Sequence, residues 1–145
     1  MRPARMSATM ASTLEMPTAE FAAAAREACD AAGAALIIDE VRAGLRLNIR
    51  GSWEALGVRP DFCAWSKAIA NGYALSAVMG NDRFRDAAAQ LYATGSFWCG
   101  ATSMAAALAT IDVLQAENGP EQMRQMGQRL RDGIAEQARR YNIGV

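Results

Sequence analysis

Residues 34–46 read AALIIDEVRAGLR, and this stretch decides the fold. A short apolar run containing Ile37 and Ile38 leads directly to a carboxylate, Asp39. The length of the run and its branched side chains are typical of a buried parallel strand. The preceding residues, 17–33, start with a candidate N-cap, Thr18, and carry apolar residues at helical spacing. A helix followed by a buried strand predicts an α/β fold with a mainly parallel sheet flanked by helices.

The rest of the chain continues this pattern. Two more strands are expected at PDFCAWS (60–66) and ALSAVMG (74–80). Helices are expected at 52–57, 81–91, 101–118 and 120–142. The apolar stripe of the last helix consists of Met123, Met126, Leu130, Ile134 and Ala138. We divide the chain into an irregular segment, 1–16, and a folded part, 17–145.

Composition excludes several classes of function. The chain has 145 residues, 52% of them hydrophobic and 21% charged, with a formal net charge of zero, so charge gives no reason to expect a nucleic-acid partner. No apolar run approaches the roughly 20 residues of a membrane span. The chain has no histidine, which excludes a Ser-His-Asp triad and every His-dependent metal site. Cys29, Cys63 and Cys99 stand far apart, which argues against disulfides or a metal site and for a reduced, cytoplasmic environment.

Lys67 is the only lysine, and the other basic residues are all arginine. It lies in an apolar run beside Trp65 and Ile69. Charged side chains are rarely buried unless they are paired or chemically used, and apolar surroundings favour the neutral amine. A neutral amine is a nucleophile that can form a Schiff base with a carbonyl. The alternative is a surface lysine whose stem covers Trp65.

Asp39 follows a predicted buried strand. Ligands of open α/β sheets bind beyond the carboxyl ends of the strands, so this carboxylate is placed to meet one. The alternative is that Asp39 caps a loop or pairs with Arg42 or Arg46.

The segment TGSFWCGATSM (94–104) precedes a predicted helix. Thr94, Gly95 and Ser96 would suit an anion such as phosphate near the helix start, although ordinary capping is the alternative. We expect Phe97 and Trp98 in a core or interface, and Cys99 as a small buried residue because no histidine can activate it.

Together these pieces resemble the class III aminotransferases, which are fold-type I enzymes dependent on pyridoxal 5'-phosphate. AALIIDEVRAGLR is similar to the family's D-E-V-x-x-G-x-R element, and GVRPDFCAWSKAIANGYALSAVMG (57–80) is similar to its P-D-x-x-x-x-x-K segment. TGSFWCGATSMAAALATIDVL (94–114) is similar to its phosphate-contacting turn and following helix. Within the class, GSFWCG (95–100) is most similar to the glutamate-1-semialdehyde aminomutases. The resemblance implies part of a three-layer large domain and, for the longer parent protein, a homodimer.

The resemblance also implies a role for four residues. Lys67 would hold the cofactor as a Schiff base and then move a proton between the substrate carbon and the cofactor. Asp39 would pair with the pyridine nitrogen and keep it protonated. Val41 would pack against the ring, and Ser96, where the family usually has threonine, would donate to the cofactor phosphate. The substrate would be a small amino acid or amino ketone.

Two alternatives to an aminotransferase or aminomutase segment remain at this point. The resemblance implies that family members are roughly three times longer than this chain. The chain is therefore expected to be a fragment that lacks other parts of the cofactor site. An inactive remnant that acts only in assembly or dimerisation, through the alanine-rich helix and the turn at 96–100, is therefore the second reading. An unrelated α/β nucleotide-binding domain is the third, and the missing glycine fingerprints argue against it.

Overall fold

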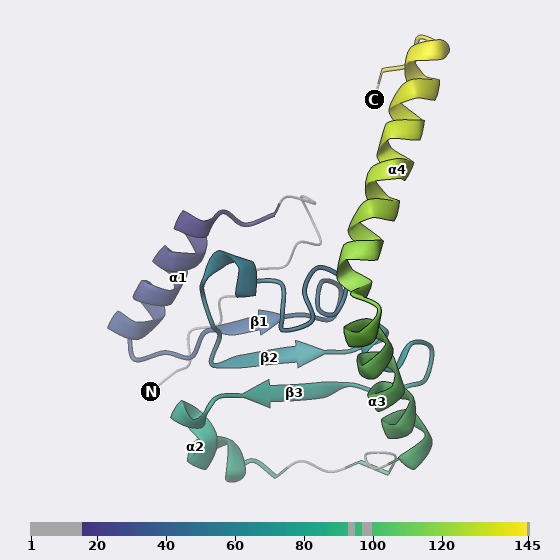
Figure 1. Cartoon of the computed structure of the whole chain (residues 1–145). Helices are drawn as coiled ribbons and strands as arrows, with labels where there is room; N and C mark the ends of the chain where they lie inside the picture. Colours follow the sequence, from purple (N-terminus) through teal and green to yellow (C-terminus); the bar gives the residue numbers. More distant parts are fainter. Residues whose placement is uncertain (1–15, 93–94, 97–99, 145) are drawn as a thin grey trace.

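The computed structural model describes residues 16–92, 95–96 and 100–144 (Figure 1). Some of the expectations stated above concern positions outside the described residues, namely 1–15, Thr94 and 97–99. The elements, in chain order, are α1 (Ala19–Ala31), β1 (Ile37–Asp39), the 3-10 turn η1 (Glu54–Leu56), β2 (Phe62–Trp65), the 3-10 turn η2 (Lys67–Ala70), β3 (Ala77–Gly80), the 3-10 turn η3 (Asp82–Phe84), α2 (Arg85–Ala89), α3 (Ala101–Ala116) and α4 (Gly119–Arg140).

The first two strands form the parallel pair that the sequence predicts. In their register Ile37 lies opposite Phe62, and Asp39 lies opposite Ala64. The ladder continues one residue further, because the Glu40 amide donates to the Ala64 carbonyl at 2.8 Å. The carboxyl ends of β1 and β2 therefore meet at one edge of the sheet.

The third strand runs the other way, which corrects the expectation of a mainly parallel sheet. β3 pairs with β2 in antiparallel register, with Trp65 opposite Ala77, so the three-stranded sheet is mixed. The connection over residues 66–76 contains only the short turn η2. A parallel return would need a longer crossover, usually with a helix, whereas a short connection suffices for an antiparallel one.

The amino-terminal helix starts as predicted. The hydroxyl of Thr18 accepts a hydrogen bond from the Phe21 amide at 3.2 Å, which is an N-cap. One hydrophobic cluster joins this helix to β1 and the loop after it; its buried members are Ala22, Ala25, Cys29, Leu36, Ile38, Trp53 and Val58. Cys29 serves this packing, and both Cys29 and Cys63 are free thiols.

A second cluster joins the sheet to α3 near the carboxyl ends of β1 and β2 (Figure 1). Its buried members are Leu45, Trp65, Ile69, Ala70 and Ala107. This cluster holds η2, the turn that starts at Lys67, against α3.

Only one face of the sheet is well covered in the described residues. Ile38, Cys63 and Ala77 belong to the two clusters, and strand alternation together with the register puts them on the same face. The opposite face carries the row Asp39, Ala64 and Val78, and Val78 is 75% exposed. The three-layer arrangement expected from the resemblance is thus incomplete in this part of the chain.

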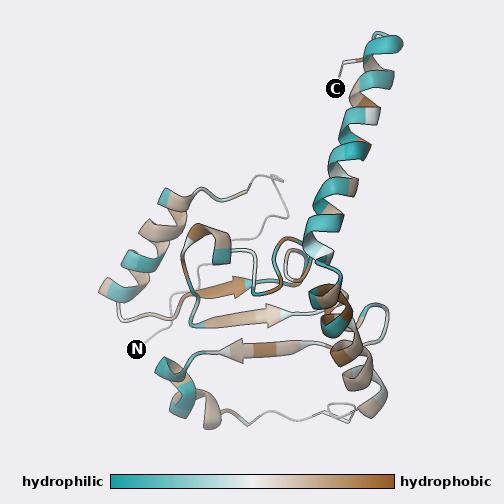
Figure 2. Ribbon diagram, viewed as in Figure 1, coloured by the Kyte–Doolittle hydropathy of each residue, from teal (hydrophilic) through white to brown (hydrophobic). Residues whose placement is uncertain are grey.

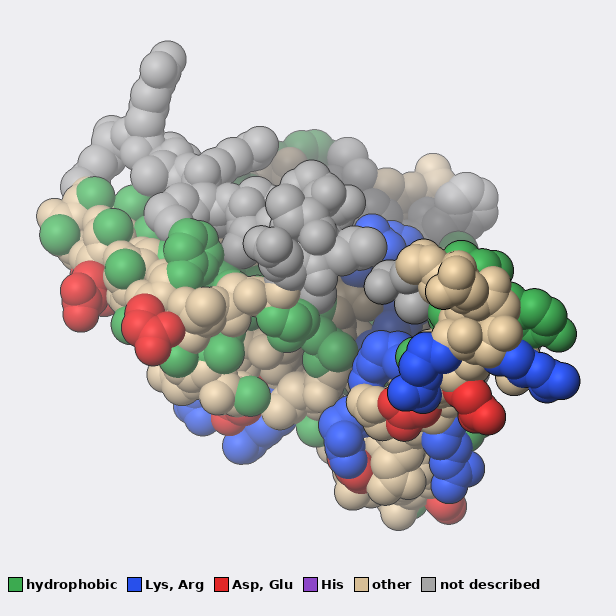
Figure 3. Space-filling model, turned by 90° about the horizontal axis from the view of Figure 1, so that it is seen from above, with side chains coloured by type: hydrophobic (Ala, Val, Ile, Leu, Met, Phe, Trp, Pro, Cys, Tyr) green, Lys and Arg blue, Asp and Glu red, His purple; other side chains and the backbone are tan. Residues whose placement is uncertain are grey.

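The last helix, α4, projects away from the sheet (Figure 1). Most of the surface of α4 is hydrophilic (Figure 2). Acidic and basic side chains lie close together on it (Figure 3), as in the pair Arg124 and Glu121, whose charged groups are 2.6 Å apart. In the predicted stripe, Ala138 is buried, but Met126, Leu130 and Ile134 are more than half exposed. The predicted helix is therefore confirmed. Among the described residues, no other element packs along its apolar stripe. None of the described helices combines the length and apolar character needed to cross a bilayer.

Candidate functional site

Asp39 and Lys67 lie at the same edge of the sheet. Asp39 is the last residue of β1, and Lys67 follows the end of β2 by two residues. Because the two strands are parallel neighbours, an acid and an amine come from adjacent strand ends. Both side chains are exposed. This edge is where ligands bind in α/β sheets.

The carboxylate of Asp39 is oriented by the chain that follows it. Its Oδ1 accepts a hydrogen bond from the Val41 amide at 2.9 Å. This contact realises the loop-capping alternative, whereas Asp39 forms no ion pair with another described residue. Arg46 instead donates from Nη1 to the Arg42 carbonyl at 2.8 Å. Val41 itself is half-buried beside Asp39.

Lys67 lies on a strained turn. Its φ is +50°, in the left-handed region, which costs a residue with a side chain roughly 1–2 kcal/mol. Beyond Lys67, Ile69 and Ala70 are buried against α3, and before it the Ser66 hydroxyl donates to the Leu75 carbonyl at 3.1 Å. These contacts hold the chain on both sides of Lys67 in place.

The apolar enclosure expected around the Lys67 side chain is absent from the described residues. Trp65 and Ile69 are buried, with 6% and 4% exposure, but Lys67 is exposed. The sequence neighbours are apolar because the side chains of Trp65, Ile69 and Ala70 enter the second cluster, whereas Lys67 stays exposed. The expectation that apolar side chains surround Lys67 is therefore wrong for the described residues. The alternative, a lysine at the surface, agrees better with the structure.

Glu40, the residue after Asp39, is a buried acid beside the candidate site. Its side chain is 2% exposed, and its Oε1 accepts bonds from the Ser52 amide at 2.7 Å and the Ser52 hydroxyl at 2.9 Å. Burial raises the pKa of the Glu40 carboxyl above its ordinary value; the two bonds from Ser52 oppose this rise, and the charge of Asp39 adds to it. Strand alternation was the available signal, because it puts Glu40 on the face opposite to Asp39.

Ser96 is not brought together with the other candidates by any contact of the described residues. It lies exposed in the connection between α2 and α3. Its assignment to the cofactor phosphate stays a prediction.

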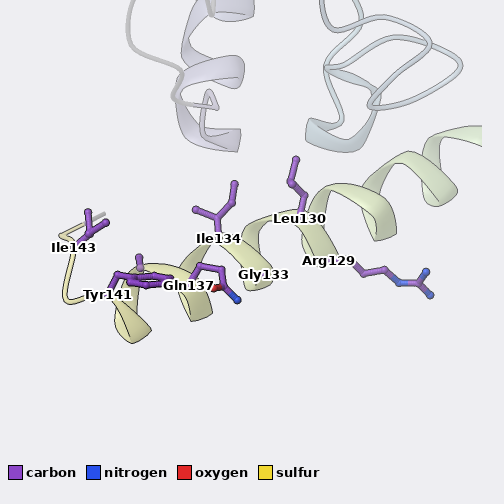
Figure 4. A pocket seen from close by; sticks show the side chains of 8 residues that line it. Arg129, Leu130, Gly133, Ile134, Gln137, Tyr141 and Ile143 are labelled. Atoms are coloured by element: carbon purple, nitrogen blue, oxygen red, sulfur yellow. The ribbon is translucent and has the colours of Figure 1, made fainter.

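The hollow shown in Figure 4 is separate from this edge. It runs along the carboxyl-terminal half of α4 and is lined mainly by Leu130, Ile134, Tyr141 and Ile143, with Arg129 at its margin. It contains neither Asp39 nor Lys67, so we regard it as part of the exposed apolar side of α4. Within the described residues, no three acidic or thiol side chains come together as a metal site would require.

Comparison with known proteins gives a consistent result. Residues 12–144 match the family model described as aminotransferase class-III. The chain is 43% identical over 124 residues to the aminopentol aminotransferase of Sphingopyxis macrogoltabida, covering 86% of this chain and 29% of that protein.

Solved structures give the same picture. The PLP internal aldimine form of the Sphingopyxis sp. MTA144 FumI protein superposes with a TM-score of 0.84 at 42% identity, over 88% of this chain and 31% of that one. An omega-transaminase from Sphaerobacter thermophilus superposes with a TM-score of 0.75 at 30% identity, over 88% and 30% of the two chains. The chain therefore spans about three tenths of the length of these relatives.

Proposed function

This chain belongs to the class III aminotransferase family, and on that premise we propose that it supplies the lysine half of the cofactor site of a transaminase dependent on pyridoxal 5'-phosphate. One observation carries the proposal: an exposed aspartate and the only lysine of the chain come from the ends of two adjacent parallel strands. An acid for the ring nitrogen and an amine for the aldehyde are the two groups that this cofactor requires from a protein. The residues present therefore fit the cofactor.

Each residue would do a separate part of the work. The amine of Lys67 would bind the cofactor covalently and, once released, would move a proton at the substrate carbon. Asp39 would keep the ring nitrogen protonated, and Val41 would pack against the ring. Ser96 would donate a hydrogen bond to the phosphate. When bound, the cofactor would supply an electron sink.

The relatives favour transfer of an amino group between two molecules. One is named as acting on an aminopentol and another on 3-aminobutyryl-CoA. We infer an amine or amino-acid donor for this chain as well. The aminomutase likeness rests on residues 95–100, and neither of these relatives supports it. A homodimer and a cytoplasmic location belong to the same proposal.

A second function is favoured by exposed apolar surface. Val78 on β3, Leu108 on α3 and Leu130 on α4 are each at least 65% exposed. Surfaces of this kind are typical of protein–protein contacts. If the chain does not bind the cofactor, it would act as an assembly module.

Trapping of the cofactor tests the proposal. The purified chain is mixed with pyridoxal phosphate, reduced with borohydride and digested, and the added mass is located by peptide mapping. We expect a saturable label on the peptide containing Lys67, which Lys67→Ala abolishes and Asp39→Asn weakens. Lys67→Arg is the matched control, because it keeps the charge but cannot form the covalent link. Label at the N-terminal amine alone would refute the cofactor role for this chain.

A further inference from the structure

Glu40, next to Asp39, is anchored by both its backbone and its side chain. Its amide donates to the Ala64 carbonyl at 2.8 Å, and its carbonyl accepts from the Gly44 amide at 2.9 Å. Its side chain accepts two bonds from Ser52. Backbone and side chain of this one residue therefore tie β1 to β2 and to both ends of the loop over residues 41–52.

The loop closes tightly around the Glu40 carboxyl. Gly51, with φ of +119°, approaches so near that a Cβ there would lie 3.2 Å from Glu40 Oε1. A Cβ on Gly44 would collide with the Trp65 ring. Two glycines thus allow the loop to pack against Glu40 and Trp65.

This anchoring bears directly on Asp39. The bond that orients the Asp39 carboxylate comes from the Val41 amide. Glu40 is the residue between them, so its position sets the position of that amide relative to β1. A change at Glu40 would therefore shift the hydrogen bond that aims Asp39.

The arrangement carries a free-energy penalty. Glu40 Oε2 is buried and has no hydrogen-bond partner among the described residues. Leaving a buried polar atom unpaired costs about 1–3 kcal/mol. Such uncompensated groups cluster at functional sites.

We propose that Glu40 is a positioning residue for Asp39: its buried carboxyl, tied to Ser52, fixes the turn that aims Asp39 at the cofactor ring nitrogen. This inference rests on the proposed function of the Asp39 and Lys67 edge. Glu40 acts through Asp39 and touches neither cofactor nor substrate.

The test is a double-mutant cycle on the affinity of the whole chain for pyridoxal phosphate, measured by absorbance titration. We expect Glu40→Ala to weaken binding about tenfold, which corresponds to a coupling typical of neighbouring residues. In an Asp39→Asn background, the same change should have less than about a twofold effect, because the residue that it positions is already impaired. Glu40→Gln, whose amide oxygen can still accept both bonds from Ser52, should restore most of the affinity. Glu136→Gln, on the exposed side of α4, is the matched control and should leave binding unchanged.

The outcomes separate this inference from the proposed function. Equal effects of Glu40→Ala in both backgrounds would show a structural role and overturn the inference while leaving the cofactor site standing. No binding by the wild-type chain would overturn both. If Glu40→Ala does not fold, Ser52→Ala replaces it, since it removes only the hydroxyl bond; its effect must also disappear in the Asp39→Asn background, and persistence would again contradict the inference.

Discussion

The two edges of the same small sheet are built in opposite ways. At the amino edge, Asp61 is 2% exposed, and its Oδ2 accepts bonds at 2.8 Å from the Leu36 amide and from Arg26. Its Oδ1 accepts from Asn81 at 3.1 Å. At the carboxyl edge, Asp39 and Lys67 are exposed.

The amino edge has the contacts of a stabilising site, and the carboxyl edge does not. Every oxygen of the buried acid at the amino edge is paired, and Arg26 and Arg83 extend the pairing to Asp30. The carboxyl edge instead has a left-handed lysine and a buried acid, Glu40, with an unpaired oxygen. Strained and unsatisfied groups persist at functional sites because the surrounding structure holds them in place.

The largest expected effect is at the amino edge. Asp61→Ala removes the carboxylate that accepts from Arg26, the Leu36 amide and Asn81, and it leaves the Leu36 amide and Arg26 without a buried partner. We therefore expect the free energy of unfolding to fall by about 3 kcal/mol. Urea denaturation measures it. Asp82→Ala, at an acid whose side chain is 95% exposed on η3, is the control and should change little. A loss below about 0.5 kcal/mol at Asp61 would remove the contrast between the edges.

A smaller effect of opposite sign is expected at the carboxyl edge. Lys67→Gly relieves the strain of φ +50° and should raise the free energy of unfolding by up to about 1 kcal/mol while abolishing cofactor trapping. Lys67→Ala keeps the strain and should show no such gain. If Lys67→Gly destabilises the chain, the turn is not a site of stored strain.

The smallest effect concerns pH, and the two buried acids should respond with opposite signs. Burial pulls the pKa of Asp61 upward, but the bonds from Leu36, Arg26 and Asn81 outweigh it and hold the pKa below the ordinary 3.8. Its stabilising contribution is therefore present above about pH 3.8 and is lost as pH falls through the lowered value.

For Glu40, burial raises the pKa above the ordinary 4.5, so its contribution is greatest below that pH and is lost as pH rises through the raised value. Asp61→Asn should flatten the acid limb of a stability profile recorded from about pH 2 to about pH 7. Glu40→Gln should reduce the gain in stability that the wild type shows as the pH falls from neutral toward about 4.5. Matching profiles for the two variants would contradict the assigned directions.

Much of the local structure could be predicted because it depends on neighbouring residues. The cap at Thr18 was correct, because the Thr18 hydroxyl accepts a hydrogen bond from the Phe21 amide three residues later. The parallel pair of strands followed from their apolar runs. The direction of β3 did not, because it depends on how far residues 66–76 can reach rather than on any strand's own pattern.

The place of the candidate residues in the fold was predictable, but their environment was not. The spacing of Asp39 and Lys67 after two strands put them at one edge. The exposure of Lys67 could not be predicted, because its apolar neighbours indicate burial and its left-handed backbone conformation is not visible in the sequence. The bond from Ser52 to Glu40 joins residues 12 positions apart and depends on the loop closing at Gly51.

We propose that the two edges have separate roles, the amino edge in stability and the carboxyl edge in binding the cofactor. The most direct test is the amount of label trapped at Lys67 per folded chain, compared between the wild type and Asp61→Asn, with Lys67→Arg as the blank. We expect equal labelling per folded chain in the wild type and Asp61→Asn, and none in Lys67→Arg. Loss of label per folded chain in Asp61→Asn, or undiminished label in Lys67→Arg, would contradict it.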